Sequence, residues 1–190
     1  MAALAGFYVV FFIVAMVLPT LRVWRATGIN PLVLPKGDDV AGFVGTWFKL
    51  LIALLGLYLL VGGLGLIQPI GPIGLRLIPA IGVGMLGFSL LWVMIAQWQM
   101  GAAWRVGIDS ANRTDLIARG LFRISRNPIF FGMMVQLLGL FLLQPDAITL
   151  SIAVAAYVLI SIQIRQEEAH LLALHGEGYA AYRAQVRRWL

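Results

Sequence analysis

The chain alternates between long apolar stretches and shorter polar or turn-forming segments. A helix needs about 20 apolar residues to cross the hydrocarbon core of a bilayer, and several stretches approach or reach that length without a break. Helices of a soluble domain would instead keep one polar face. We predict an all-α integral membrane bundle of five transmembrane helices, at residues 2–18, 46–67, 77–97, 129–143 and 147–164.

Turn-forming residues mark the ends of these helices. Pro19 is expected to end the first helix, and the sequence QPIGPIG at residues 68–74 follows the second. The sequence QPD at residues 144–146 separates the last two helices, with Asp146 placed to cap the second of them. No soluble module stands apart from the apolar stretches, so residues 1–190 are predicted to form one domain.

The last two predicted helices form a short hairpin. Residues 129–143 reach only about 22 Å as a helix, less than a hydrocarbon core of roughly 30 Å. Neighbouring helices are therefore expected to shield the hairpin. The sequences RISRNP and RQEEAH flank its cytoplasmic base, and polar groups converge there.

Composition and charge agree with a membrane location. Hydrophobic residues make up 61% of the chain and charged residues 12%, and the mean hydropathy is +0.92. The absence of cysteine excludes disulfides, thiolate metal sites and a cysteine nucleophile. The net charge of +6 comes from basic residues beside apolar stretches, which favours anionic lipid headgroups over nucleic acid as the partner.

The positions of these basic residues predict the topology, because loops rich in Lys and Arg stay in the cytoplasm. Thirteen of the fourteen fall after the first or third span or in the tail: Arg22, Arg25, Lys36, Lys49, Arg105, Arg113, Arg119, Arg123, Arg126, Arg165, Arg183, Arg187 and Arg188. Arg76 is the exception. We expect a multi-pass protein of the cell inner membrane with its N-terminus outside and its C-terminus in the cytoplasm.

Most familiar catalytic patterns are missing from the sequence. Glu167 and His170 could supply only two metal ligands, so no metal site is expected. The chain has no phosphate-binding loop, no nucleophile elbow and no strand on which a dinucleotide fold could rest.

A cluster of polar residues remains at the cytoplasmic base of the hairpin. Helical spacing gives two stripes about 100° apart: Gln163, Glu167 and His170 on one, and Tyr157, Ser161 and Glu168 on the other. The adjacent glutamates therefore face different neighbours, one toward the bundle and the other toward headgroups or Arg165. A carboxylate beside an arginine-rich loop suits a zwitterionic small molecule. Simple anchoring at the membrane surface is the alternative interpretation.

The sequence RNPIFFG begins the fourth span. Pro128 fits the first turn of a helix, whose free N–H groups then lie near Arg126 and Asn127 and suit an anion. Gly132 permits close approach of a ligand or of another backbone. A proline-started helix with a packing glycine is the alternative.

The sequences RNPIFFG and EEAHLLALHGEGYAAYRAQVRRW together resemble two motifs of the superfamily that contains isoprenylcysteine carboxyl methyltransferases and phospholipid methyltransferases. The resemblance covers residues 99–190, and residues 1–98 match only as three generic spans. It implies an enzyme that uses S-adenosylmethionine, gives S-adenosylhomocysteine as product, and binds the cofactor between the loop after residue 99, the hairpin and the C-terminal helix.

The resemblance also implies roles for individual residues. The wall for the methionine and ribose parts of the cofactor would consist of Arg126, Asn127, Pro128 and Gly132. The amino or hydroxyl groups of the cofactor would bind to Glu167 and Glu168. The adenosine side would be lined or closed by His170, His175, Tyr179 and Tyr182. Trp104 and Arg105, in the loop at residues 99–108, would stack and steer. The residues expected to be catalytic are Arg105, Arg126 and Glu167. Asn127 and Phe130 stand where the family often has histidine and tyrosine.

The acceptor expected from the resemblance is a lipophilic small molecule or a prenylated substrate, methylated on a carboxylate as in isoprenylcysteine carboxyl methyltransferases. A phospholipid amine and a thiol are alternatives. Displacement from a sulfonium needs alignment and desolvation rather than a protein nucleophile, which suits the few ionisable residues. A lipid-binding membrane scaffold is the non-enzymatic alternative, and a transporter is disfavoured because the spans contain no charged residue apart from Lys49, near the start of the second.

The C-terminus is predicted to form an amphipathic helix at the membrane surface. Its apolar stripe would consist of Tyr179, Tyr182, Val186 and Trp189, with Arg183 and Arg187 on another side. The sequence HGEG at residues 175–178 would be the hinge before this helix.

Overall fold

A computed structural model of the protein describes residues 1–33, 37–67, 77–107 and 114–190. Within these ranges the chain is helical, as predicted, and a single isolated bridge joins Leu32 to Val106. The helices are α1 (Ala2–Phe12), α2 (Leu18–Thr27), α3 (Val40–Gly63), α4 (Leu77–Met100), α5 (Pro128–Leu143), α6 (Ala147–His175) and α7 (Glu177–Gln185), with a π-helical turn at Ile13–Val17 and 3-10 turns at Gly101–Ala103 and Gly120–Arg123. The turn predicted at residues 68–74 and three of the counted basic residues, Lys36, Arg76 and Arg113, lie outside the described residues.

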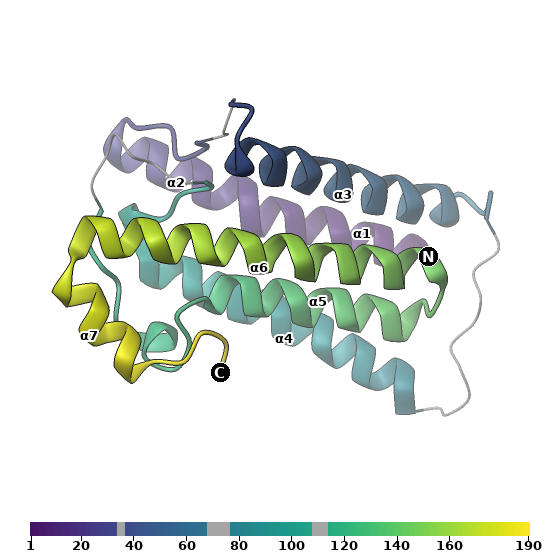
Figure 1. The fold of residues 1–190 in the computed structure, drawn as a ribbon. Coiled ribbons are helices and arrows are strands. Elements are labelled where there is room, and N and C mark those ends of the chain that lie inside the picture. The colour runs from purple at the N-terminus through teal and green to yellow at the C-terminus, as the bar shows by residue number, and fades with distance from the viewer. Residues whose placement is uncertain (34–36, 68–76, 108–113) are drawn as a thin grey trace.

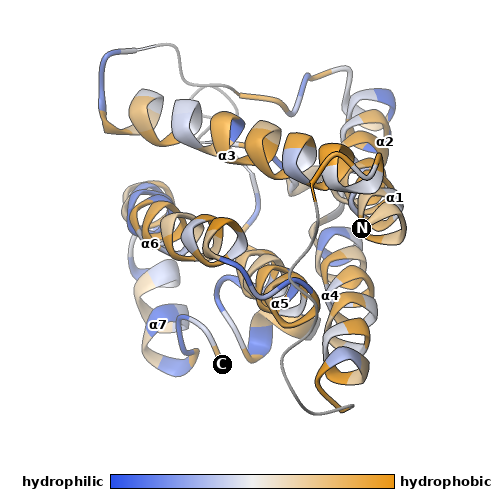
Figure 2. Ribbon diagram, turned by 90° about the vertical axis from the view of Figure 1, so that its right-hand side faces the viewer, coloured by the Kyte–Doolittle hydropathy of each residue, from blue (hydrophilic) through white to orange (hydrophobic). Residues whose placement is uncertain are grey.

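The long helices lie side by side, and α7 packs across one end of the bundle (Figure 1). A buried core between α3, α4, α5 and α6 consists of Leu55, Tyr58, Leu59, Leu86, Leu140 and Ile152. Apolar side chains also cover the outside of the helices, whereas α7 and the nearby loops are more polar (Figure 2). Large exposed residues such as Leu57, Leu91 and Trp98 suit contact with lipid rather than with water.

Four helical segments of the described chain are long and apolar enough to cross a membrane: Ala2–Thr27, Val40–Gly63, Leu77–Ala103 and Ala147–His175. Helix α5 has 16 residues and reaches about 24 Å, so it is shorter than a typical span. It packs along α4, where an added Cβ at Gly82 would lie 3.1 Å from the carbonyl oxygen of Gly139. These two glycines let the backbones of α4 and α5 approach closely.

The prediction that Pro19 ends the first helix is wrong. Helices α1 and α2 run continuously through a π-helical turn at Ile13–Val17, and Pro19 lies in the first turn of α2. Proline has no N–H for the carbonyl of Ala15, four residues earlier, and the side chain of Gln97 on α4 donates to that carbonyl instead at 2.6 Å. A neighbouring helix therefore satisfies the group that the proline leaves without its helical partner.

Other predicted boundaries also differ: α3 ends at Gly63 rather than residue 67, and α4 continues to Met100 rather than ending at residue 97. Helix α3 begins at Val40 rather than residue 46, because the side chain of Asp39 accepts a hydrogen bond from the Gly42 N–H at 2.7 Å and caps it. Lys49 was counted with the loop although it falls within the predicted span at residues 46–67, and it lies inside α3. Helix α6 continues beyond residue 164 to His175, since its polar residues find partners inside the bundle.

The predicted cap and hinge of α6 are confirmed. The Asp146 carboxylate accepts from the Thr149 N–H at 2.9 Å and also from the Tyr58 hydroxyl of α3, which fixes the start of α6. At its other end, Gly176 has a φ of 54°, a conformation that favours glycine, and the chain turns there into α7.

The predicted C-terminal helix is shorter than expected. Helix α7 ends at Gln185, and Val186 begins an extended tail with a φ of −116° and a ψ of 133°. The apolar stripe from Tyr179 to Trp189 therefore does not exist as one helical face. Tyr179 packs into the bundle instead, and the Trp189 ring stacks on Tyr157 of α6 at a centroid distance of 6.5 Å.

Candidate functional site

A cavity of about 390 Å³ extends through the bundle between α1, α3, α4, α5, α6 and α7. The loop segments at residues 103–107 and 114–117 form part of its wall. Pockets that hold small organic molecules have similar volumes. The cavity therefore has room for a ligand, and its lining changes in character along its length.

One part of the cavity is lined by polar and charged side chains from four segments. Arg126 and Asn127 come from the loop before α5, Gln163 and Glu167 from α6, and Tyr179 and Tyr182 from α7. Arg105 and Asp115 add charge from the loops between α4 and α5. The start of α5 and the end of α6 lie at the end of the bundle that α7 covers (Figure 1).

The rest of the cavity is lined mainly by hydrocarbon, and the polar side chains there include Tyr8, Gln97 and Gln136. Its walls come from α1, α3, α5 and α6 and include Phe11, Phe12, Ala15, Leu51, Ile52, Leu55, Met133, Leu137, Ile152, Ala156 and Ile160. On α6 the lining residues Ile152, Ala156, Ile160, Gln163 and Glu167 follow one helical stripe. One face of α6 therefore leads from an apolar region to a carboxylate.

The two adjacent glutamates of α6 have different neighbours, as predicted from their helical spacing. Glu167 lines the cavity and accepts a hydrogen bond from the Gln163 side chain at 2.8 Å. Glu168 is buried in a separate polar cluster that adjoins the cavity. Neither pairs with Arg165, whose guanidinium donates to the backbone carbonyl of Ser161 at 2.6 Å.

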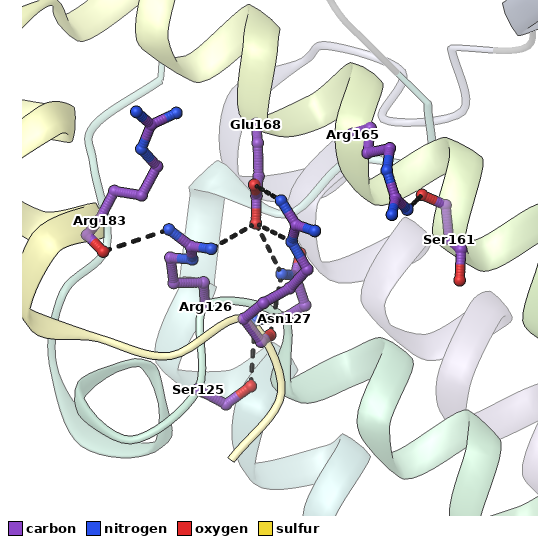
Figure 3. A network of polar contacts seen from close by, with 8 residues as sticks. Ser125, Arg126, Asn127, Ser161, Arg165, Glu168 and Arg183 are labelled. Carbon is purple, nitrogen blue, oxygen red and sulfur yellow. Dashed lines mark hydrogen bonds and ion pairs between the residues drawn. The ribbon is translucent and has the colours of Figure 1, made fainter.

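Glu168 lies at the centre of an ion-pair cluster (Figure 3). Its Oε1 lies 3.2 Å from Nη2 of Arg126 and accepts from the Asn127 side chain at 3.4 Å. Arg188 binds both carboxylate oxygens, with Nε to Oε1 at 3.1 Å and Nη2 to Oε2 at 2.8 Å. The Glu168 side chain is 7% exposed, so these partners rather than water compensate its charge.

The C-terminal tail is tied to the start of α5 by its backbone as well. The Arg126 N–H donates to the Arg187 carbonyl at 2.9 Å, and the Asn127 side chain donates to the Arg188 carbonyl at 3.1 Å. The Arg126 guanidinium also donates to the Arg183 carbonyl at 3.3 Å. Residues 183–188 therefore hold the loop before α5 against α6.

Tyr179 and Tyr182 close the cavity from α7. The Tyr182 hydroxyl donates to the Phe122 carbonyl at 2.7 Å, and the two rings lie 5.9 Å apart. The Tyr179 side chain is 1% exposed, and its hydroxyl has no hydrogen-bond partner among the described residues. Burial raises the pKa of each tyrosine to about 12, so both hydroxyls are neutral donors at physiological pH.

The start of α5 is built as predicted around its proline. Pro128 occupies the first turn and lines the cavity, and its carbonyl accepts from the Trp92 indole of α4 at 2.9 Å. Ser125 is fully buried, and its hydroxyl accepts from the Asn127 N–H at 3.1 Å. The contacts of Gly132 are with α4, where an added Cβ would lie 2.5 Å from Cγ2 of Val93.

The structure thus gathers most of the predicted site residues but not all of them. Glu168 lies in the ion-pair cluster beside the cavity. The cavity wall includes Arg105, Arg126, Asn127, Pro128, Glu167, Tyr179 and Tyr182. Among the described residues, Gly132, His170 and His175 are not part of the cavity wall. Arg105 donates to the carbonyls of Ala102 and Trp104, which fixes its side chain at the cavity's edge.

Sequence reasoning missed three residues of this region. Arg188 was counted only among the basic residues that set the topology, because nothing in its spacing indicates a contact with Glu168 across the turn at Gly176. Ser125 gives no signal beyond its place next to the RNP sequence. Gln136 is a single amide in an apolar run, and that isolation is the one signal that could have marked it.

The comparison with protein families gives one match. The family described as phospholipid methyltransferase matches residues 77–178, from the start of α4 into α7, which is more than half of the chain. No curated protein and no solved structure matched the chain. The matched segment includes both RNPIFFG and the two glutamates, together with the polar wall from Arg105 to Glu167. This protein is therefore an integral membrane protein that belongs to the phospholipid methyltransferase family, within the methyltransferase superfamily that its two motifs resemble.

Proposed function

We propose that the protein transfers a methyl group from S-adenosylmethionine to an acceptor dissolved in the membrane. The observation that carries this proposal is the single cavity that joins a polar region, near Arg126 and Glu167, to an apolar region between the helices. A soluble cofactor and a lipophilic acceptor have to meet, and such a cavity gives each a matching surface. Membership of a methyltransferase family supports the same conclusion.

The residues of the polar region fit the groups that S-adenosylmethionine carries. Its carboxylate requires a cation or N–H donors, and the buried Nε of Arg126 has no partner among the described residues. Its ammonium and ribose hydroxyls require an acceptor, which Glu167 provides. Arg105, Arg126 and Glu167 remain the residues that we propose as catalytic.

The protein's own part in the reaction is to bind, orient and exclude water. When bound, S-adenosylmethionine supplies an electrophilic methyl group on a sulfonium, which a lone pair displaces in line. Tyr179 and Tyr182 close the polar region, and the apolar wall keeps water from the acceptor. Glu168, held by Arg126 and Arg188, keeps the loop before α5 in place while Glu167 stays available.

We propose that all five apolar helices, including the short α5, belong to the membrane-embedded part. The N-terminus would lie outside the cell's inner membrane, and α7 with its arginine-rich surroundings would face the cytoplasm, where S-adenosylmethionine is made. Packing of α5 along α4 supports this arrangement, because it shields a helix too short to span the bilayer alone.

A radiolabel transfer assay tests the proposed reaction. Purified protein in lipid nanodiscs receives S-adenosylmethionine labelled in its methyl group, together with either phosphatidylethanolamine or a farnesylated thiopropionate. We expect label in the organic phase with one of them. Label released as methanol by base identifies a methyl ester on a carboxylate, whereas base-stable label identifies an N-methyl amine. Failure to label any acceptor, with no affinity for S-adenosylhomocysteine, would favour a lipid-binding scaffold instead.

A further inference from the structure

The apolar region of the cavity contains a few polar side chains that the proposed reaction does not use, and Gln136 is one of them. Gln136 is the ninth residue of α5, lies on the cavity wall and is 5% exposed. It lies roughly 12 Å along the helix axis from Pro128. Among the described residues, its amide has no hydrogen-bond partner.

Other polar side chains in the apolar region do have partners. The Tyr8 hydroxyl donates to the Ile52 carbonyl at 2.6 Å, and the Gln97 amide donates to the Ala15 carbonyl at 2.6 Å. Water is scarce at this depth in a membrane protein, so an unpaired amide there is unfavourable. Gln136 differs from Tyr8 and Gln97 in that its amide is left for a ligand.

We propose that Gln136 binds the methyl acceptor, through a hydrogen bond from its amide to a carbonyl oxygen within the acceptor's apolar part. This inference rests on the proposed function, and it makes Gln136 the residue that recognises the ester-linked or amide-linked acyl chain of a lipid acceptor. An acyl lipid places such carbonyls between its headgroup and its hydrocarbon. A prenyl chain is hydrocarbon throughout and offers nothing to this amide.

The cavity wall places Gln136 where such a carbonyl would lie. On α5 the lining residues Ile129, Phe130, Met133, Gln136 and Leu137 follow one face, which begins next to Asn127 in the polar region. A lipid whose reactive headgroup reaches Arg126 and Glu167 extends its chain along this face. A hydrogen bond at Gln136 would then fix how deeply the acceptor sits, and so where its nucleophile lies.

A matched pair of lipids tests the proposal without requiring turnover. Short-chain phosphatidylethanolamine with two ester-linked chains is compared with its diether analogue, which has the same headgroup and chains but no carbonyl. Binding to protein in detergent micelles is followed by tryptophan fluorescence, to which Trp104 on the cavity wall contributes, and by the shift in melting temperature. We expect the wild type to bind the ester about tenfold more tightly than the ether, as the loss of one buried hydrogen bond implies.

The variant Gln136→Leu is expected to bind both lipids with equal affinity. Gln136→Met, of similar length and also without an amide, serves if the first variant folds poorly. The control is Leu138→Met, on the outer face of α5 and not on the cavity wall, which should keep the preference for the ester. Equal binding of ester and ether by the wild type would overturn the proposal, and so would a preference for the ester that persists unchanged in Gln136→Leu. Titration with S-adenosylhomocysteine separates failure of this proposal from failure of the proposed function. The wild type and both variants at position 136 should bind S-adenosylhomocysteine with the same affinity, so absence of that binding would count against the proposed function and not against the role of Gln136.

Discussion

Arg188 binds both carboxylate oxygens of Glu168, with Nε 3.1 Å from Oε1 and Nη2 2.8 Å from Oε2. Helix α6, the turn at Gly176, helix α7 and the tail separate the two residues along the chain. The contact therefore fixes α7 and the tail over the polar part of the cavity. Hydrogen bonding to Glu168 raises the pKa of Arg188 further above its usual range, so the pair stays charged at any physiological pH.

The first prediction concerns this tail contact. Arg188→Gln removes the charged contact of the tail with Glu168 and leaves the hydrogen bonds from Arg126 and Asn127 to the tail carbonyls, so the affinity for S-adenosylhomocysteine should fall by about tenfold. Arg187→Gln removes the same charge one residue earlier from an exposed side chain. Calorimetric titration should find it close to wild type. Equal loss in both variants would mean that net charge, rather than the contact with Glu168, matters.

The two adjacent glutamates should behave differently when each is changed to glutamine. Glu168→Gln leaves Arg126 and Arg188 without a carboxylate, so the melting temperature should fall, by the equivalent of about 1–3 kcal/mol given that Arg188 is partly exposed. Glu167→Gln should leave the melting temperature unchanged and abolish measurable cofactor binding. A stable Glu168→Gln variant together with an unstable Glu167→Gln variant would reverse the roles assigned to the two residues.

The bond from Gln97 to Ala15 should stabilise α1 only because Pro19 is present. Gln97→Leu leaves the Ala15 carbonyl without its donor and should destabilise the protein by about 1–3 kcal/mol in thermal unfolding. Pro19→Ala supplies a helical N–H for that carbonyl, so adding it to Gln97→Leu should recover much of the loss. Purely additive effects of the two changes would show that the proline and the glutamine are not coupled.

Gly132 of α5 should act in helix packing. A methyl group there would lie 2.5 Å from Cγ2 of the fully buried Val93, so Gly132→Ala should force α4 and α5 apart and cost about 1–3 kcal/mol. Gly84, in α4, has no atom within 4 Å of an added Cβ. Gly84→Ala should therefore be neutral or slightly stabilising in the same melting experiment. A destabilised Gly84→Ala variant would indicate a general intolerance of alanine in these helices instead.

Local signals in the sequence predicted much of the fold. Asp146, Pro128 and Gly176 act within one turn of their own position, so cap, start and hinge were correct. Pro19 was misread because its consequence is resolved by Gln97, 78 positions later in the chain. The end of α6 was placed too early because hydropathy falls at Gln163, where the apolar stretch ends but the helix does not.

The candidate site could be predicted only as far as it depends on neighbouring residues. The pairing of Gln163 with Glu167 follows from helical spacing. The contact between Arg126 and Glu168 required the two family motifs to meet, and their resemblance supplied that expectation. The role of Arg188 depends on how the tail folds back, which has no local signal, and Gln136 is marked in the sequence only by its isolation in an apolar run.

The most direct test of the central claim is calorimetric titration of the purified wild-type protein with S-adenosylhomocysteine. A cofactor site between Arg126, Glu167, Tyr179 and Tyr182 predicts saturable binding of one molecule per chain, with a raised melting temperature, and loss of both effects in Glu167→Gln. Absence of heat and of any thermal shift in a folded wild-type sample would contradict the assignment of this cavity to S-adenosylmethionine.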